Sequence, residues 1–147
     1  MAIVKVRSHV APRTITFSAQ GIRGAHERVF KRVGLRDLIT IITTFRLSPR
    51  AVGELLGGVS RQAVNQWMIA GVPTERVPDV ARIADVARRL RATIKPERIP
   101  AIISRPNPGL GGESVLDVLR AGRPGDVMRA LDRLESWVPG GVEPDVA

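Results

Sequence analysis

Residues 57–71 have the sequence GGVSRQAVNQWMIAG, in which two glycines open a short segment and a third closes it. Val64 and Trp67 lie three residues apart, so in a helix they share one face. Ser60 has the side chain of an N-terminal cap, and Gly71 is typical of a helix end. The segment therefore predicts one short amphipathic helix over 60–70. Its polar side chains are Ser60, Arg61, Gln62, Asn65 and Gln66.

The preceding residues 47–58, LSPRAVGELLGG, predict a second short helix. Ser48 can cap its free N–H groups, and Pro49 occupies the first helical position, where no donor is needed. Apolar residues recur at helical spacing, and we expect them to pack against Val64 and Trp67 of the next helix. Two short helices joined by a tight glycine turn form a helix-turn-helix pattern. The apolar residues are Val52, Leu55 and Leu56 in the first helix and Val59 in the turn.

That packing would present the other face of residues 60–70 as a rigid polar surface. The major groove of B-DNA admits one α-helix, and forked side chains match its base edges, Arg with guanine and Asn or Gln with adenine. Because the N-terminal residues of such a helix reach deepest, we predict that Arg61, Gln62 and Asn65 read bases. Gln66 would contact a base or a phosphate, and Arg50 a phosphate. The alternative is an ordinary solvated face. The predicted DNA-contacting set is Arg50, Ser60, Arg61, Gln62, Asn65 and Gln66.

Charge is distributed unevenly along the 147 residues, which carry a net charge of +9. Residues 1–100 hold 18 basic and 7 acidic residues, a net charge of +11, whereas residues 101–147 hold 5 and 7, a net charge of −2. A basic body with a mildly acidic end indicates a polyanionic partner for the body; the alternative is a basic but merely solvated surface.

The remaining patterns are helical, so we predict an all-α fold with a helix-turn-helix core and a small helical C-terminal module. Residues 22–33 predict a helix that ends at Gly34, with Ile22, Val29, Phe30 and Val33 roughly on one side. Residues 35–45 predict another helix, although their β-branched run also allows a strand. Further helices are predicted over 76–94, 113–121 and 124–137, with a Pro/Gly-rich loop over 104–112. In the last helix we expect Val127, Leu131, Leu134 and either Trp137 or Val138 to face inward.

These patterns divide the chain into four parts. Residues 1–20 are predicted to be a flexible basic arm rather than one short strand, because a lone strand has nothing to pair with. Residues 21–94 would form the DNA-binding domain, residues 95–138 the C-terminal module, and residues 139–147 a flexible acidic tail. Apolar runs fall well short of the roughly 20 residues that a membrane helix needs, and the absence of Cys fits a reducing compartment. We therefore expect a cytoplasmic protein, nucleoid-associated when bound to DNA, with no membrane partner.

Enzymatic patterns are missing from the sequence. The stretch GLGGES (109–114) lacks the Lys-Ser/Thr ending of a phosphate loop, so a turn followed by a helix cap is the better interpretation. His9 and His26 lie in different segments, and no cluster has the spacing of metal ligands or of a Ser-His-acid triad. We expect no catalytic site, metal or cofactor.

Two stretches resemble a known family. VSRQAVNQW (59–67) is similar to the Xre-type, lambda-repressor-like helix-turn-helix, although the Glu that commonly follows the Trp is absent. Residues 98–134, RIPAIISRPNPGLGGESVLDVLRAGRPGDVMRALDRL, resemble the toxin-binding domain of the Xre/MbcA/ParS antitoxins. A Trp usual before the loop is replaced by Ile102 or Ile103, and a Pro after the cap by Val115. The residues that carry the likeness are Pro106, Asn107, Pro108, Leu110, Gly111, Gly112, Ser114, Leu116, Leu119, Gly122 and Val127.

This resemblance implies an antitoxin of a type II toxin–antitoxin system. Such proteins bind RES-domain toxins, which consume NAD, and repress their own operon as homodimers or larger assemblies; the DNA site would be an inverted repeat in the operator. The loop over 106–112 and the last helix would form or support the toxin contact, and the acidic tail would approach the toxin's active site. The alternatives are a stand-alone helix-turn-helix repressor, a nonspecific nucleoid protein, and a tail with no partner. The implied toxin-binding residues are Pro106, Asn107, Leu110, Gly111, Gly112, Glu143 and Asp145.

Overall fold

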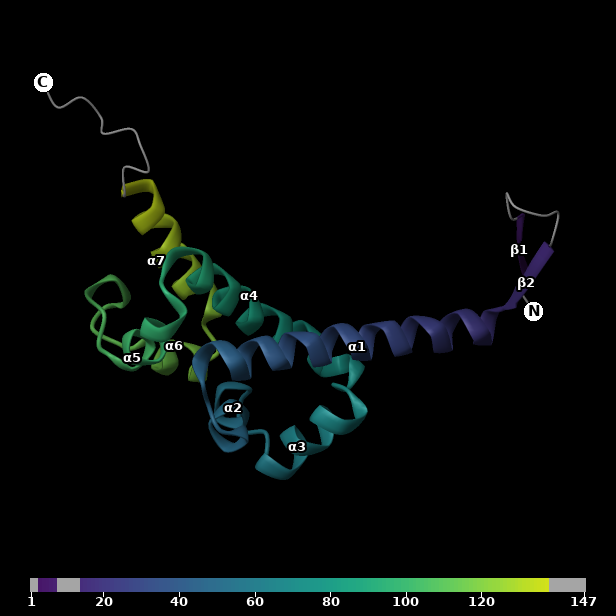
Figure 1. Ribbon diagram of the computed structural model, residues 1–147, viewed down its shortest axis with the longest axis horizontal. Helices are drawn as coiled ribbons and strands as arrows, with labels where there is room; N and C mark the ends of the chain where they lie inside the picture. Colours follow the sequence, from purple (N-terminus) through teal and green to yellow (C-terminus); the bar gives the residue numbers. More distant parts are fainter. Residues whose placement is uncertain (1–2, 8–13, 138–147) are drawn as a thin grey trace, which may run out of the picture.

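The computed structural model describes residues 3–7 and 14–137, and Figure 1 shows their arrangement. Helices build the body of the molecule, which confirms the predicted all-α class, and a two-stranded hairpin precedes them at the N-terminal end of the longest helix. The elements are β1 (Ile3–Arg7), β2 (Thr14–Ser18), α1 (Ala19–Phe45), α2 (Pro49–Leu55), α3 (Arg61–Ala70), the short 3-10 helix η1 (Thr74–Arg76), α4 (Val77–Thr93), η2 (Pro96–Arg98), α5 (Ile99–Ser104), η3 (Pro108–Leu110), α6 (Val115–Arg120) and α7 (Pro124–Trp137).

Helix α1 is the longest helix described, and only its C-terminal half packs against the other helices. Leu38, Ile41 and Phe45 are fully buried there and lie against α4. A buried carboxylate on the same face, Asp37, forms an ion pair with Arg88 of α4. The N-terminal half projects beyond α3 and α4 (Figure 1). The same helix therefore has one half inside the core and one half outside it.

Gly34 does not end a helix, contrary to the prediction from sequence. Helix α1 runs through it without a break. A Cβ at this position would lie 2.8 Å from Val72 Cβ and 2.9 Å from Val77 Cγ2. The glycine is needed because the segment between α3 and α4 crosses α1 at close range, so its role is tertiary packing rather than chain punctuation.

Helices α2 and α3 are two short helices joined by a tight turn, which is compatible with the predicted helix-turn-helix pattern, and Gly53 determines how closely they meet. A Cβ on Gly53 would lie 1.9 Å from the carbonyl oxygen of Val59 in the turn. The Gly53 carbonyl accepts hydrogen bonds from the N–H groups of Gly58 at 3.1 Å and Val59 at 2.9 Å. Gly57 and Gly58 have positive φ angles of 85° and 91°, as a tight reversal after a helix requires. The turn therefore folds directly onto the backbone of α2.

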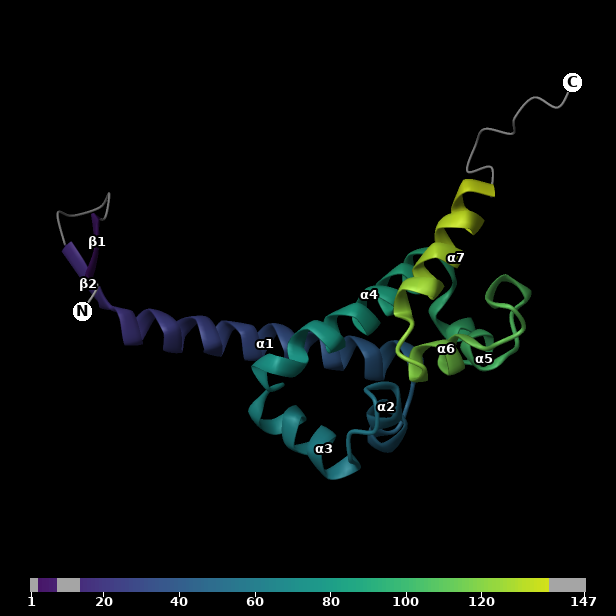
Figure 2. The same cartoon turned by 180° about the vertical axis from the view of Figure 1, so that it is seen from behind.

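The C-terminal helices α5 to α7 share one hydrophobic core with α1 to α4. Ile99 and Ile103 of α5, Leu119 of α6 and Val127 of α7 all belong to the cluster that includes the buried residues of α1 to α4. Leu131 of α7 is buried as predicted, but Leu134 is 51% exposed. Leu134 is exposed because the last turns of α7 extend past the end of α4, where none of the other described helices covers them (Figure 2).

The N-terminal residues pair as a hairpin. Strand β1 runs antiparallel to β2, with Ile3 opposite Ser18 and Arg7 opposite Thr14. The sequence argument expected an unpaired arm, or at most a single strand without a partner. The two weakly alternating stretches are instead partners of each other, so each supplies the hydrogen-bonding edge that the other needs.

No helix among residues 14–137 is long and apolar enough to cross a membrane.

Candidate functional site

Helix α3 is held at both ends by the residues predicted to hold it. The Ser60 hydroxyl accepts a hydrogen bond from the Ala63 N–H at 3.1 Å, and the Gly71 N–H donates to the Trp67 carbonyl at 2.8 Å. Val64 is fully buried, and Trp67 is 8% exposed. Capping at the ends and packing underneath fix α3 as a rigid element, because each removes freedom that an isolated ten-residue helix would keep.

The opposite side of α3 carries four exposed polar side chains, here called the polar face of α3: Arg61, Gln62, Asn65 and Gln66. They stand in two rows at i and i+4, Arg61 with Asn65 and Gln62 with Gln66, so they share one side of the helix. Within the described part of the chain, none of these side chains makes a hydrogen bond or an ion pair. Their donors and acceptors therefore face outward.

Arg50 lies in the first turn of α2. Its side chain is 82% exposed and its Nε is 3.9 Å from an Oε1 of Glu54. Glu54 is also approached at 3.9 Å by Arg120 of α6. Two long contacts to one exposed carboxylate are weak, so the guanidinium of Arg50 is loosely held and accessible to an anion.

Two features beside α3 escaped the sequence analysis. Ile69, in the last turn, is 81% exposed, and it lies next to a hollow of about 260 Å³. Three cations of α1 line the same hollow: Arg28, Lys31 and Arg32. The sequence shows both the basic residues of α1 and the apolar Ile69. No sequence pattern indicated that α1 would pass beside the end of α3.

The loop over 106–112 is organised by Asn107. Its side-chain oxygen accepts from the Gly109 N–H at 2.8 Å, and its backbone carbonyl accepts from Leu110 at 3.0 Å and Gly112 at 2.9 Å. Leu110 is buried and anchors the loop to the core, whereas Gly111 and Gly112 are exposed. Of the implied toxin-binding residues here, Asn107 and Leu110 thus support the loop, and Pro106, Gly111 and Gly112 lie on its surface.

Helix α6 begins with the predicted capping box. The Asp117 N–H donates to the Ser114 hydroxyl at 3.1 Å, and the Ser114 N–H donates to the Asp117 carboxylate at 3.4 Å. The Ser114 side chain, the Ser114 backbone and Arg120 together hold the pKa of Asp117 below its ordinary value of 3.8. The stretch GLGGES is therefore a turn followed by a helix cap.

Charged side chains around α6 and α7 pair with one another. Arg123 lies 2.7 Å from Glu113 and 3.2 Å from Asp126, and Glu113 raises the pKa of Arg123 above its ordinary range. Asp126 also pairs with Arg129, and Arg120 lies 3.2 Å from Asp117. This paired surface of the C-terminal module is defined by Glu113, Asp117, Arg120, Arg123, Asp126 and Arg129.

Some residues named in the sequence analysis fall outside the part of the chain that the structure describes. Glu143 and Asp145, in the acidic tail, lie outside the described residues, as does His9. Within residues 14–137, no group of three or more His, Cys, Asp or Glu side chains could hold a metal ion.

No family model matches the chain, and no curated protein does. Among solved structures, the chain is similar to a chain in the crystal structure of the M. tuberculosis MbcT–MbcA toxin–antitoxin complex, with 20% sequence identity and a TM-score of 0.60. The match covers 71% of this chain and 95% of that one. The all-helical body described above is therefore a fold that also occurs in a chain of a toxin–antitoxin complex.

Proposed function

We propose that the protein is an antitoxin that binds operator DNA through α3, represses its own operon and neutralises a RES-domain toxin. The fold similarity to a chain of a toxin–antitoxin complex supports the antitoxin part. The resemblance of residues 98–134 to the toxin-binding domain of Xre/MbcA/ParS antitoxins supports it independently, because it rests on sequence.

The observation that carries the DNA-binding part is the unpaired polar face of α3. Its Arg61 presents a forked donor that fits guanine O6 and N7, and its Asn65 presents an amide that fits adenine N6 and N7. The helix beneath them is rigid, so the side chains are ordered on a fixed backbone before DNA arrives. Arg50 on α2 supplies a charge for a neighbouring phosphate. This is the division of labour between base contacts and phosphate contacts that specific DNA binding uses.

The projecting half of α1 supports a homodimer. Val29 is 61% exposed, and Phe30 and Val33 are also exposed on the same stretch of helix. An isolated helix of this length is marginal in water unless its apolar residues find a partner, and a second copy offers an identical apolar row in a two-fold arrangement. Two-fold docking on DNA would separate the half-sites by about 34 Å or a multiple of that distance.

The toxin contact is assigned to the surface of the 106–112 loop together with α7. Asn107 and Leu110 hold the loop in one conformation, so Pro106, Gly111 and Gly112 are presented by a fixed backbone. Arg133 of α7 donates to the Gly109 carbonyl at 3.2 Å and joins the two parts of the surface. The tail residues Glu143 and Asp145 would add carboxylates that pair with cationic side chains in a site for NAD.

The DNA-binding part is tested by titrating the protein's own upstream DNA and a scrambled duplex of equal length, at fixed salt, with fluorescence anisotropy. Specific binding requires at least a thousandfold preference for the native sequence, the lower end of the range for specific complexes. Equal affinity for both duplexes would show a nonspecific nucleoid protein that acts through charge alone.

The antitoxin part is tested by coexpressing the product of the neighbouring reading frame and purifying the chain through an affinity tag. A RES-domain protein that copurifies in fixed stoichiometry, and whose toxicity the chain suppresses, is the expected result. Specific DNA binding without any copurifying toxin would leave a stand-alone repressor.

A further inference from the structure

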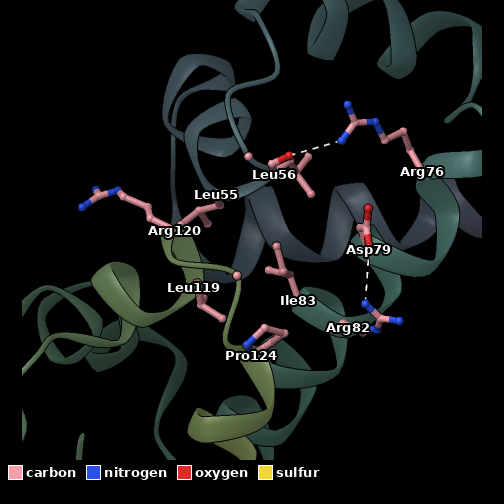
Figure 3. Close-up of a pocket in the computed structure, with 11 residues that line it drawn as sticks. Leu55, Leu56, Arg76, Asp79, Arg82, Ile83, Leu119, Arg120 and Pro124 are labelled. Atoms are coloured by element: carbon pink, nitrogen blue, oxygen red, sulfur yellow. Dashed lines mark hydrogen bonds and ion pairs between the residues drawn. The ribbon is translucent and has the colours of Figure 1, made fainter. Parts of the chain in front are cut away.

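A cavity of about 300 Å³ lies where the helix-turn-helix part meets the C-terminal helices. Figure 3 shows its apolar wall. It is built from Leu55 at the end of α2 and Leu56 directly after it, Ile83 of α4, Leu119 of α6 and Pro124 at the start of α7. The four aliphatic side chains are buried. An aromatic ring fits an apolar cavity of about 150 Å³, so this one is large enough for a small organic molecule.

Charged side chains stand at one side of this cavity. Arg76 reaches toward α2, where its Nη1 donates to the Leu56 carbonyl at 3.5 Å (Figure 3). Asp79 lies between Arg76 and Arg82 and is 3.5 Å from the latter. Arg120 also lines the cavity, but its head group points away and pairs with Asp117 and Glu54. With Arg120 already paired, the guanidinium groups of Arg76 and Arg82 stand against the single carboxylate of Asp79, so this side of the cavity carries a net positive charge.

The two nearest arginines are held loosely. A nitrogen–oxygen distance of 3.5 Å is beyond the usual range for a protein hydrogen bond, about 2.7–3.2 Å, and it is the one interaction of the Arg76 side chain with the described residues. The Arg82–Asp79 pair is equally long, and both side chains are largely exposed. Either guanidinium can therefore turn toward a carboxylate ligand and bind it through two parallel N–H groups, a stronger interaction than the one it gives up.

We propose that this cavity is a binding site for a small amphipathic anion, a carboxylate with an aromatic or branched aliphatic body. The apolar body would lie against Leu55, Ile83 and Leu119, and the carboxylate would face Arg76 and Arg82. The site would connect α2, α4 and the α6–α7 turn, so the bound molecule stabilises the seating of the C-terminal helices on the helix-turn-helix part. This activity goes beyond the proposed function and does not depend on DNA or on a toxin.

Three probes of the same shape and different charge test the site: benzoate, benzamide and benzylammonium. Each is titrated at fixed ionic strength into the full-length, ¹⁵N-labelled protein, and amide chemical shifts are followed by NMR. Benzoate should shift the amides of residues 55–57, 76–83 and 119–122 in one saturable process. Benzamide should bind about tenfold more weakly, and benzylammonium should not shift these amides. Scattered or absent shifts with benzoate, or equal binding of all three probes, would overturn the proposal.

A matched pair of variants separates the site from general charge. Arg76→Gln removes one guanidinium from the cavity and should weaken benzoate binding about tenfold. Arg91→Gln removes an exposed guanidinium from α4, away from the cavity, and should leave benzoate binding unchanged. If Arg76→Gln binds benzoate as well as the parent does, the assignment of the carboxylate position is wrong. None of these outcomes bears on DNA binding, so the site and the proposed function can fail separately.

Discussion

The polar face of α3 and the paired surface of the C-terminal module are both exposed and both polar. They differ in how many of their hydrogen-bonding and charged groups have a partner within the chain. On α3, the side chains of Arg61, Gln62, Asn65 and Gln66 make no contacts with polar groups of the described residues. Around α6 and α7, charged groups are joined in pairs, for example Arg123 with Glu113 at 2.7 Å. The first surface keeps its hydrogen-bonding capacity for another molecule, and the second uses much of that capacity within the chain.

Because their groups are paired to different extents, the two surfaces also contribute differently to the free energy of unfolding. Exposed ion pairs are worth little individually, but a capped helix start such as that of α6 is worth about 1 kcal/mol. The polar face of α3 contributes almost nothing to folding, because its side chains have the same solvent contacts in the folded and unfolded states. Mutations should therefore affect binding on α3 and stability around α6.

The largest expected effect comes from the residue beneath the polar face. Trp67→Ala should lower the free energy of unfolding by about 3–5 kcal/mol, because the indole is 8% exposed and packs in the core below α3. Urea denaturation followed by circular dichroism measures the change. A loss below about 1 kcal/mol would mean that α3 is not held by this packing, and its polar face could not be rigid.

The next effect separates binding from folding on α3. Arg61→Ala and Asn65→Ala should each weaken binding to the native upstream DNA by about 1–3 kcal/mol and flatten sequence preference, with the free energy of unfolding unchanged within about 0.5 kcal/mol. Anisotropy titrations and denaturation are run on the same samples. Arg91→Ala is the control, because it removes one exposed positive charge on α4. Variants that discriminate DNA as well as the parent would refute the assignment of base contacts.

Around α6 we expect a mutation to change stability and not DNA affinity. Ser114→Ala should lower the free energy of unfolding by about 1 kcal/mol, because it removes the hydroxyl that accepts the Asp117 N–H at 3.1 Å, and it should leave affinity for DNA unchanged. Denaturation measures the change in the free energy of unfolding, and anisotropy measures the affinity for DNA. A change in DNA affinity without a change in stability would contradict the contrast between the two surfaces.

The smallest effect depends on pH. Because the folded-state pKa of Asp117 is lowered from its ordinary value of 3.8, its stabilising contribution is present above that unfolded-state pKa and is lost as pH falls through the folded-state pKa. Asp117→Asn removes the ionisable group, so the stability difference between parent and variant should be positive at pH 7 and should shrink below pH 4. Denaturation curves at several pH values measure it. A difference that does not vary with pH would show that the carboxylate charge is not involved.

Sequence alone predicted the parts of the fold that local chemistry determines. Ser48, Ser60 and Ser114 begin helices as expected, and Gly71 ends one, because a cap acts on neighbouring N–H and C=O groups whatever the rest of the chain does. The same logic failed at Gly34. A glycine that ends a helix and one that lets another segment approach are indistinguishable until the approaching segment is known.

The candidate site likewise has features that local sequence predicts and features that depend on tertiary contacts. The polar face of α3 followed from the spacing of Val64 and Trp67, since one buried side of a short helix defines the exposed one. The burial of Leu110, the cations of α1 beside Ile69 and the cavity near Arg76 did not follow. Each depends on segments far apart in sequence, and no local pattern encodes their meeting.

The shared core has a consequence for how the protein responds to proteolytic cleavage. The buried residues of α5, α6 and α7 belong to the same cluster as those of α1 to α4, so each part completes the interior of the other. A protease cut in the short connection between α4 and α5 would leave two fragments with uncovered apolar faces, and neither would keep its shape alone. Degradation that starts at the C-terminal end would therefore also unfold α3 and its polar face.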